Sequence, residues 1–368
     1  MSHNAGSSQT PQTPNEQAVL DALRTVNDPD LDRDIVSLNF VKDLKIDGGK
    51  VSFTIELTTP ACPMKKEMER WAREAVQKVE GVTDIAINMT AAVTHGAANA
   101  GKQKIEGVRN VIAVGSGKGG VGKSTVTVNL AIALAQSGAS VGIMDADIYG
   151  PNIPLMMGIT GRPYAIGERI QTLANYGVRL MSMGFLMEED DTPVMWRGPM
   201  LHSVIQQFLR QVDWLELDYL LIDLPPGTGD VQLSLTQTVP LTGAVVVSTP
   251  QDVALQDAKK AIQMFRQTEV PVLGIVENMS YFQCPKCGEI SNIFSHGGAA
   301  ETAKRYGVPL LGEVPLNITL REGGDAGKPV VAMLPDSPAA QSFREIAAQV
   351  ASQVSIANAG KRKLTVIQ

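Results

Sequence analysis

The chain has 368 residues, of which 44% are hydrophobic, and its formal net charge at pH 7 is −6 with a sequence pI near 5.4. This acidic balance argues against a protein built mainly to bind nucleic acid, and no apolar run approaches the roughly 18 residues that a membrane span requires. Three cysteines are too few for a disulfide framework, which favours a reducing, cytoplasmic compartment.

The first quarter of the chain predicts a polar tail followed by a small α+β domain. Residues 1–15 are rich in Ser, Thr, Gln, Pro and Asn, a composition typical of a disordered tail. Hydrophobic periodicity over residues 16–92 predicts helices at 16–26 and from Pro60 onward, and strands at 40–46, 51–57 and 85–89. Cys62 is expected at the start of the second helix, where a thiolate is favoured, although a lone cysteine there is more often structural.

Residues 93–107 are small and polar and are expected to form a flexible linker to a second, larger domain over residues 108–353. There the pattern of strand, helix and strand predicts an α/β fold with a mostly parallel sheet covered by helices on both faces. The expected strands are 111–114, 141–144, 178–181, 219–222, 244–247, 272–276 and 309–312. One helix is expected to start at Lys123, and further helices are expected at 200–212, 231–238, 255–267, 298–306 and 339–350. Residues 354–368 are expected to be a C-terminal tail.

A glycine-rich stretch between the first of these strands and the first helix matches the phosphate-binding pattern Gly-x4-Gly-Lys-Ser. Its backbone N–H groups can close on the phosphates of ATP, Lys123 can reach the β- and γ-phosphates, and Ser124 can hold Mg²⁺. Lys118 is a second lysine that an ordinary phosphate-binding loop does not need. The expected nucleotide-binding residues are Gly117, Lys118, Gly119, Gly120, Val121, Gly122, Lys123, Ser124 and Thr125.

Further candidates stand where predicted strands end, because ligands of open α/β sheets bind at the carboxyl ends of strands. Asp145 and Asp147 follow one strand, and we assign Asp147 to the attacking water and Asp145 to Mg²⁺ support. Asp223 ends another strand, the position expected for a carboxylate that binds a water molecule of the Mg²⁺ ion. Gly227 lies just beyond it, and we expect its backbone N–H to sense the γ-phosphate. Asn278 offers a donor and an acceptor to an adenine edge, although an Asn in a turn explains the pattern equally well.

Cys284 and Cys287 are separated by two residues, a spacing that can grip one metal centre. Zinc or a cubane cluster requires four ligands, and the chain contains no second pair of this kind. His296 and Cys62 are candidates to complete a zinc knuckle. Otherwise a second copy of the chain across a two-fold axis would supply the other half-site, and a redox disulfide is a third interpretation.

Taken together, these motifs resemble the Mrp/ApbC iron–sulfur cluster carrier ATPases, which belong to the deviant Walker A class of MinD, ParA and the nitrogenase iron protein. The resemblance rests on residues 117–125, 144–152, 222–230 and 284–287 and extends from about 109 to 349, while residues 16–92 resemble the small iron–sulfur-assembly domain often fused ahead of it.

The resemblance implies a P-loop NTPase that works as an ATP-dependent homodimer and binds a [4Fe-4S] cluster between Cys284 and Cys287 of two chains. It implies slow ATP hydrolysis, and as partners an iron–sulfur scaffold and recipient apoproteins, with no nucleic acid and no membrane. It also implies that Lys118 reaches the nucleotide of the partner subunit, so the expected catalytic residues are Lys118, Lys123 and Asp147.

Two other functions remain open at this point. A MinD/ParA-like positioning or partitioning ATPase would bind membrane or DNA through a basic amphipathic helix. Residues 355–368 are too short and too mixed in composition to form such a helix. That function also leaves the cysteine pair without a role. A zinc-stabilised nucleotide-binding regulator is the second alternative, and it uses the cysteines only to hold a structural metal.

Overall fold

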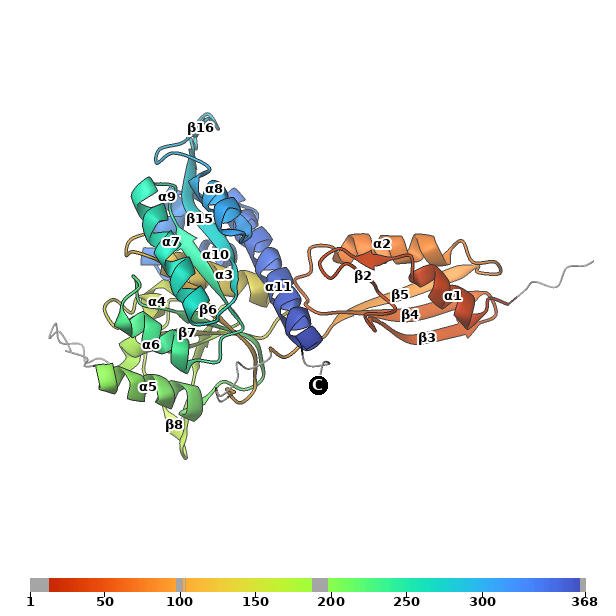
Figure 1. The fold of residues 1–368 in the computed structure, drawn as a ribbon, viewed down its shortest axis with the longest axis horizontal. Helices are drawn as coiled ribbons and strands as arrows, with labels where there is room; N and C mark the ends of the chain where they lie inside the picture. The colour runs from red at the N-terminus through yellow and green to blue at the C-terminus, as the bar shows by residue number, and fades with distance from the viewer. Residues whose placement is uncertain (1–12, 97–101, 103, 187–197, 365–368) are drawn as a thin grey trace, which may run out of the picture. The chain divides into compact units, whose positions relative to one another are not determined.

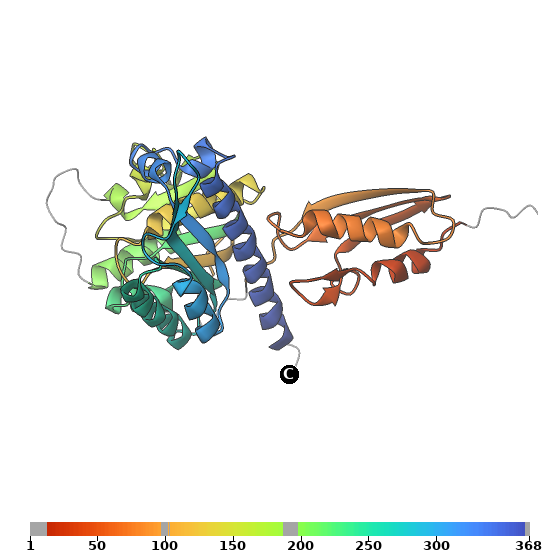
Figure 2. The same ribbon diagram turned by 90° about the horizontal axis from the view of Figure 1, so that it is seen from above.

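The protein is described by a computed structural model that covers residues 13–96, 102, 104–186 and 198–364 (Figures 1 and 2). The chain divides into two compact units, Met1–Val93 and Thr94–Gln368, and each is considered by itself. Most of the expected N-terminal tail and the middle of the expected linker lie outside the described residues. None of the described helices has the length and apolar composition needed to cross a bilayer.

In its described residues the first unit has a three-stranded sheet, a two-stranded sheet and two helices. In chain order its elements are α1 (Glu16–Leu23), β1 (Asn27–Asp28), β2 (Arg33–Asp34), β3 (Val41–Asp47), β4 (Lys50–Leu57), α2 (Lys65–Val76) and β5 (Asp84–Ala91). β4 lies in the middle, antiparallel to β3 and parallel to β5. Alternate residues of β4 are buried with the apolar stripe of α2, which includes Met68, Ala72 and Val76. The alternating sequence pattern therefore predicts this strand correctly.

The second helix of this unit begins later than the sequence suggests. Thr59 Oγ1 accepts a hydrogen bond from the N–H of Ala61 at 3.2 Å, forming a turn, and α2 starts only after Met64. Cys62 therefore lies before the helix and packs against the core of the unit. Burial raises the pKa of the Cys62 thiol to about 11, and the carboxylates of Asp28 and Asp30 act in the same direction. This environment opposes a thiolate and agrees with the structural role that the sequence favours for Cys62.

The second unit is built on a central sheet that has nine strands within the described residues, in the order β10-β11-β7-β13-β6-β14-β15-β16, with β17 also paired to β15. The strands are β6 (Val108–Gly115), β7 (Val141–Asp145), β10 (Leu173–Asn175), β11 (Val178–Ser182), β13 (Leu217–Asp223), β14 (Gly243–Ser248), β15 (Val272–Gln283), β16 (Ile290–Ser291) and β17 (Leu310–Leu316). Only the pairs β10–β11 and β15–β16 are antiparallel in this sheet. The predicted mostly parallel sheet is confirmed.

Helices cover both faces of this sheet (Figures 1 and 2). α3 packs with α11 on one face, and α7 packs with α8 on the other. α3 is apolar on nearly all sides because it is enclosed between the sheet and α11. The helices are α3 (Lys123–Gln136), α4 (Ile153–Met156), α5 (Gly198–Gln211), α6 (Asp230–Thr238), α7 (Asp252–Gln267), α8 (Gly298–Tyr306), α9 (Ile318–Asp325), α10 (Val330–Met333) and α11 (Pro338–Leu364).

The two ends of this unit are more ordered than composition alone suggests. α11 continues to Leu364 through residues that we expected to form a tail, and Asn358 on it donates to the carbonyl oxygen of Thr94 at 3.2 Å. The same carbonyl accepts a hydrogen bond from Asn110 of β6 at 2.9 Å. The described start of the expected linker is therefore fastened to the second unit. A small sheet of β8 (Ala165–Ile166), β9 (Arg169–Gln171) and β12 (Val212–Asp213) was not predicted, since such short segments carry no periodicity.

Candidate functional site

Two adjoining pockets, of about 370 and 380 Å³, lie at the carboxyl ends of the central strands. The first is lined by the glycine-rich loop and by the segment after β7. The second shares Gly122, Thr125, Asn152 and Met156 with the first and continues over residues that follow β17. Of the expected nucleotide-site residues, those lining the first pocket are Lys118, Gly119, Gly120, Gly122, Lys123, Ser124, Thr125 and Asp147.

Glycines shape the loop because side chains do not fit there. A Cβ added to Gly117 would lie 2.1 Å from the backbone of Asp257 in α7, and one added to Gly122 would lie 2.2 Å from Asn278 Nδ2. Gly120 and Gly122 also have positive φ values of 79° and 81°. The loop then leads directly into α3, so the first pocket is lined by the loop and by the N-terminal residues of a helix, as phosphate binding requires.

A buried cluster around Asp223 lies under the loop. Lys123 Nζ is 2.6 Å from Asp223 Oδ2 and 3.5 Å from Asp147 Oδ2. The hydroxyl groups of Ser124 and Thr127 donate to the two oxygens of Asp223 at 2.7 and 2.6 Å. Hydroxyl and carboxylate oxygens are the ligands that Mg²⁺ prefers, so the pair of Ser124 and Asp223 fits a Mg²⁺ site at the edge of the phosphate pocket.

Asp145 and Asp147 have different surroundings. Asp147 lines the first pocket, and its Oδ1 accepts hydrogen bonds from the N–H groups of Tyr149 and Gly150 at 3.1 and 3.3 Å. Burial raises the pKa of Asp147, against the lowering effect of Lys123. Asp145 is fully buried and accepts from Ser182 Oγ at 2.8 Å and from the N–H of Asp147 at 3.2 Å. The Asp145 carboxylate faces Ser182 and holds the chain that carries Asp147, and its expected support of Mg²⁺ stays a prediction.

The burial of Asp145 predicts a pH dependence of stability. Burial, and then the charge of Asp223, raise the pKa of Asp145 from 3.8 to about 8. Between about pH 4 and pH 8 the Asp145 carboxyl is therefore protonated in the folded state and ionised in the unfolded state. The free energy of unfolding that this proton contributes is complete below about pH 4 and is lost as the pH rises toward 8. We expect Asp145→Asn to become more stable relative to the wild type by up to about 1.4 kcal/mol per pH unit across this range. Urea unfolding of the two proteins without nucleotide checks this, and parallel pH profiles would contradict it.

The structure changes the interpretation of Gly227 and Asn278. The N–H of Gly227 donates to the carbonyl of Ser116 at 3.0 Å, so it would have to leave this partner to reach a γ-phosphate, and that role stays a prediction. Asn278 lies inside β15, not at its end, and its Nδ2 donates to the carbonyl of Val121 at 2.8 Å. Its Oδ1 is buried without a hydrogen-bond partner among the described residues. Asn278 also lines the second pocket, and its expected contact with an adenine edge stays a prediction.

Cys284 and Cys287 lie on the turn of the hairpin that joins β15 to β16, and neither lines the nucleotide pockets. The turn is closed by hydrogen bonds from the N–H of Cys284 to Glu289 and from the N–H of Gly288 to Cys284. Backbone hydrogen bonds from Cys287 and then Lys286 lower the pKa of the Cys284 thiol, which favours the thiolate that binds metals. Both cysteines are free thiols, and Cys287 is exposed.

His296 does not form a metal-binding group with the cysteine pair. Among the described residues one of its ring nitrogens groups instead with the carboxylates of Glu277 and Glu313, with the ligand atoms within 4.8 Å of one another. The zinc knuckle that combined His296 with Cys284 and Cys287 is therefore not formed in this structure.

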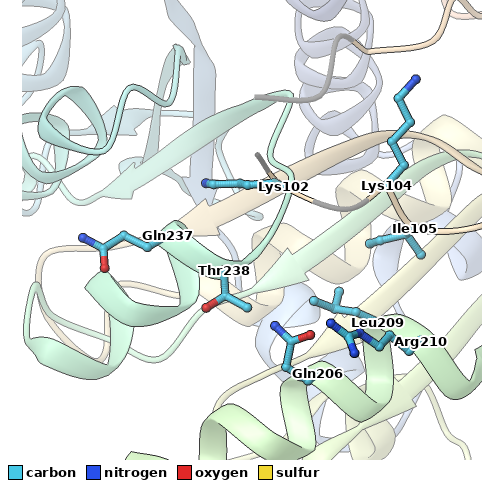
Figure 3. A pocket seen from close by; sticks show the side chains of 8 residues that line it. All are labelled: Lys102, Lys104, Ile105, Gln206, Leu209, Arg210, Gln237 and Thr238. Atoms are coloured by element: carbon cyan, nitrogen blue, oxygen red, sulfur yellow. The ribbon is translucent and has the colours of Figure 1, made fainter. Parts of the chain in front are cut away.

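A further pocket of about 320 Å³ lies between α5, α6 and the chain before β6 (Figure 3). Its basic residues do not converge on a common point. Lys102 Nζ donates to the carbonyls of Thr236 and Val239, and the Lys104 side chain extends away from Arg210. This arrangement offers no built anion site, and the pair of pockets at the glycine-rich loop remains the candidate site.

Several site residues were not identified from the sequence. Thr127 was detectable, since it stands four residues after Lys123 and so shares a helix face with it. The others carry no local signal, because only the folded sheet brings them to the pockets. They are Ser182, Tyr149, Asn152, Leu316, Asn317, Leu320 and Arg321.

Comparison with known proteins places these features in a family. Residues 107–351 match the family model described as NUBPL iron-transfer P-loop NTPase. Residues 16–89 match the model described as iron-sulfur cluster assembly protein. The two matches correspond to the two units of the structure.

Relatives with assigned names are similar over most of the chain. An iron-sulfur cluster carrier protein of Synechocystis sp. is 50% identical over 346 residues, which cover 92% of this chain and 98% of the relative. The iron-sulfur cluster transfer protein NUBPL of Mus musculus is 55% identical over 253 residues, covering 68% of this chain and 79% of the relative.

Solved structures agree on the fold of the second unit. A nucleotide-binding protein of Archaeoglobus fulgidus, in complex with ADP, is 41% identical with a TM-score of 0.57, covering 65% of this chain and 94% of its own. The cell division ATPase MinD of Pyrococcus furiosus is 25% identical with a TM-score of 0.50, covering 66% of this chain and 98% of its own.

Proposed function

This chain belongs to the NUBPL iron-transfer P-loop NTPase family, and from that membership and the site we propose that it is an ATP-dependent iron–sulfur cluster carrier. The family resemblance and the fold class predicted from the sequence are confirmed by the family matches and by the solved structures. The proposed cargo is a [4Fe-4S] cluster, received from a scaffold and transferred to apoproteins in the cytoplasm. The names of the relatives support this role.

One observation carries the proposal: a single strand connects the nucleotide site to the cysteine pair. β15 contacts the glycine-rich loop through Asn278 and Val121, and its end leads directly into Cys284. A change in the loop on nucleotide binding can therefore be passed along β15 to the hairpin. Neither alternative function gives this connection a purpose, because the cysteines have no role in a positioning ATPase and only a static one in a zinc-stabilised regulator.

The residues of the first pocket suit slow ATP hydrolysis. The loop N–H groups and Lys123 bind the phosphates, and Asp147 orients a water for attack on the γ-phosphate. The raised pKa of Asp147 makes its carboxylate a better proton acceptor for that water. Ser124 and Asp223 hold Mg²⁺, which when bound neutralises charge on the phosphates.

The cargo site requires a second copy of the chain. Each chain supplies two thiolates at the hairpin, and a cubane cluster takes about four. Two hairpins that face each other on a two-fold axis complete the set, so we propose a homodimer. A cluster on exposed hairpins is accessible to an acceptor protein, which suits a carrier.

Anaerobic reconstitution of the full chain with iron and sulfide tests the proposed function. A bound cluster gives broad visible absorption that follows the protein through gel filtration, and this is the expected result. Protein that stays colourless, or that takes up zinc alone, would support the regulator instead. Colourless protein that binds lipid vesicles or DNA in the presence of ATP would support the positioning ATPase.

The homodimer proposal predicts a particular behaviour of Lys118. This half-buried lysine lines the first pocket, but Lys123 is the lysine that is bonded to Asp223 under the loop. If Lys118 acts on the nucleotide of the partner subunit, Lys118→Ala lowers the hydrolysis rate by about 10-fold or more while ATP affinity changes little. Mixing Lys118→Ala with Lys123→Ala chains then restores part of the activity, since one composite site is intact. Heterodimers that form but remain inactive would argue that Lys118 acts within its own chain.

A further inference from the structure

Three metal-binding side chains meet outside the nucleotide pockets and away from the cysteine pair. Glu277 of β15 and Glu313 of β17 are direct partners in the parallel register of these strands. His296 approaches them from the segment before α8, and the ligand atoms of all three lie within 4.8 Å of one another. Glu277 is fully buried, Glu313 is half-buried, and His296 is exposed.

The charges of this cluster are not balanced by the protein. None of the ion pairs in the described part of the chain joins a lysine, an arginine or His296 to Glu277 or Glu313. Two carboxylates directly opposite each other on neighbouring strands repel, and burial of one of them strengthens the repulsion. A positive group between the carboxylates would remove this unfavourable energy.

Ser280 arranges the cluster in the manner of a prepared metal site. Its Oγ donates to Glu277 Oε1 at 2.6 Å, and the N–H of Ala299 donates to Glu277 Oε2 at 2.8 Å, so the carboxylate is fixed in orientation. Ser280 Oγ also lies 3.4 Å from His296 Nδ1. The donor in this contact depends on the tautomer of His296, and a metal ion can bind whichever ring nitrogen carries the lone pair.

We propose that Glu277, His296 and Glu313 bind a divalent first-row transition metal ion. One imidazole nitrogen and two carboxylates form a mixed nitrogen and oxygen donor set of the kind that zinc, iron(II) and manganese(II) accept. Three ligand atoms each about 2.1 Å from one tetrahedral ion lie about 3.4 Å apart, so a pair at the 4.8 Å limit of this cluster needs to approach by about 1.4 Å. The exposed side of His296 leaves room for water as further ligands.

The site is separate from the functions already proposed. It shares no residue with the nucleotide pockets, and neither Cys284 nor Cys287 belongs to the cluster. An ion there would tie β15, β17 and the segment before α8 together, on the strand that leads into the cysteine hairpin (Figure 1). The inference does not depend on cluster carriage, since the metal is held by different side chains.

The test measures zinc binding in the full chain with the thiols of the hairpin removed. In a Cys284→Ser/Cys287→Ser background, with Mg²⁺ in excess to occupy the oxygen ligands of the loop, equilibrium dialysis against Zn²⁺ is expected to give about one ion per chain. His296→Ala and Glu313→Gln in this background are each expected to weaken binding by about 10-fold or more. Glu277 is left unchanged because it also holds the first turn of α8.

Matched variants control for nonspecific loss of ligands. His95→Ala removes another exposed histidine, and Glu289→Gln removes an exposed carboxylate on the cysteine hairpin, and both are expected to bind zinc as the background does. His296 is exposed, so its replacement leaves the fold intact, and circular dichroism checks this.

Absence of zinc binding in the background would mean that the cluster does not bind the metal. Equal binding by all four variants would place the metal elsewhere. Either result overturns the proposal.

Discussion

Lys123→Ala is expected to hydrolyse ATP at least about 100-fold more slowly than the wild type. In the structure Lys123 is the buried cation between Asp223 and Asp147, at the mouth of a pocket lined by the glycine-rich loop. Phosphate charge must draw the ammonium group toward the pocket, where it stabilises the charge that develops during transfer. Alanine removes that cation, and nothing else in the loop replaces it, since Lys118 stands near the start of the loop.

The same substitution also affects stability, and the experiment must separate the two effects. Without Lys123, Asp223 keeps only the hydroxyl groups of Ser124 and Thr127, and leaving a buried charge unpaired costs about 3–5 kcal/mol. Lys123→Arg retains the charge and so should fold normally. Its rigid planar group does not reproduce the lysine geometry, and hydrolysis should still fall steeply. We would measure the steady-state ATPase rate and the thermal unfolding of both variants, so that the effect on hydrolysis is separated from the effect on stability. The exposed Lys328→Ala is the control. A well-folded Lys123→Arg with the wild-type rate would remove Lys123 from the mechanism.

The glycine-rich loop was predictable because its chemistry is local. Consecutive residues supply the turns, the N–H groups and the helix start, and the apolar strand before it sets its direction. Asp147 and Asp223 were placed near the loop for a related reason, since parallel strands end at one edge of a sheet. These predictions needed only the order of strands and helices.

The sequence could not predict which way a side chain or an N–H group faces. Asp145 and Asp147 are two residues apart, yet one faces Ser182 and the other faces the pocket. The N–H of Gly227 is taken by Ser116, and the thiol of Cys62 is buried against a core. Each outcome depends on a neighbour brought in by the tertiary fold, which periodicity and spacing do not encode.

β15 is longer than the sequence predicts, and its length determines how the cysteine pair is connected to the nucleotide site. The apolar run of the strand stops near Val276, whereas the strand continues to Gln283 with polar residues paired to β17 and β16. A strand that ends early would leave the cysteines on an independent loop. The observed strand joins the contact with the glycine-rich loop, the Glu277 cluster and the cysteine hairpin on one continuous backbone.

That continuity leads to the second large expected effect, which is loss of the cluster from the cysteine variants. We expect the reconstituted wild type to hold about four iron atoms per dimer, because each chain contributes two thiolates to one cubane cluster. Cys284→Ala and Cys287→Ala should each remove the visible absorption and nearly all bound iron while ATP still binds, since both cysteines lie outside the nucleotide pockets. Cys62→Ala is the matched control, because the raised pKa of its buried thiol disfavours the thiolate form. Iron and protein assays after gel filtration give the stoichiometry. A full cluster on each monomer, or a cluster that survives the loss of Cys284, would show that two hairpins do not share the site.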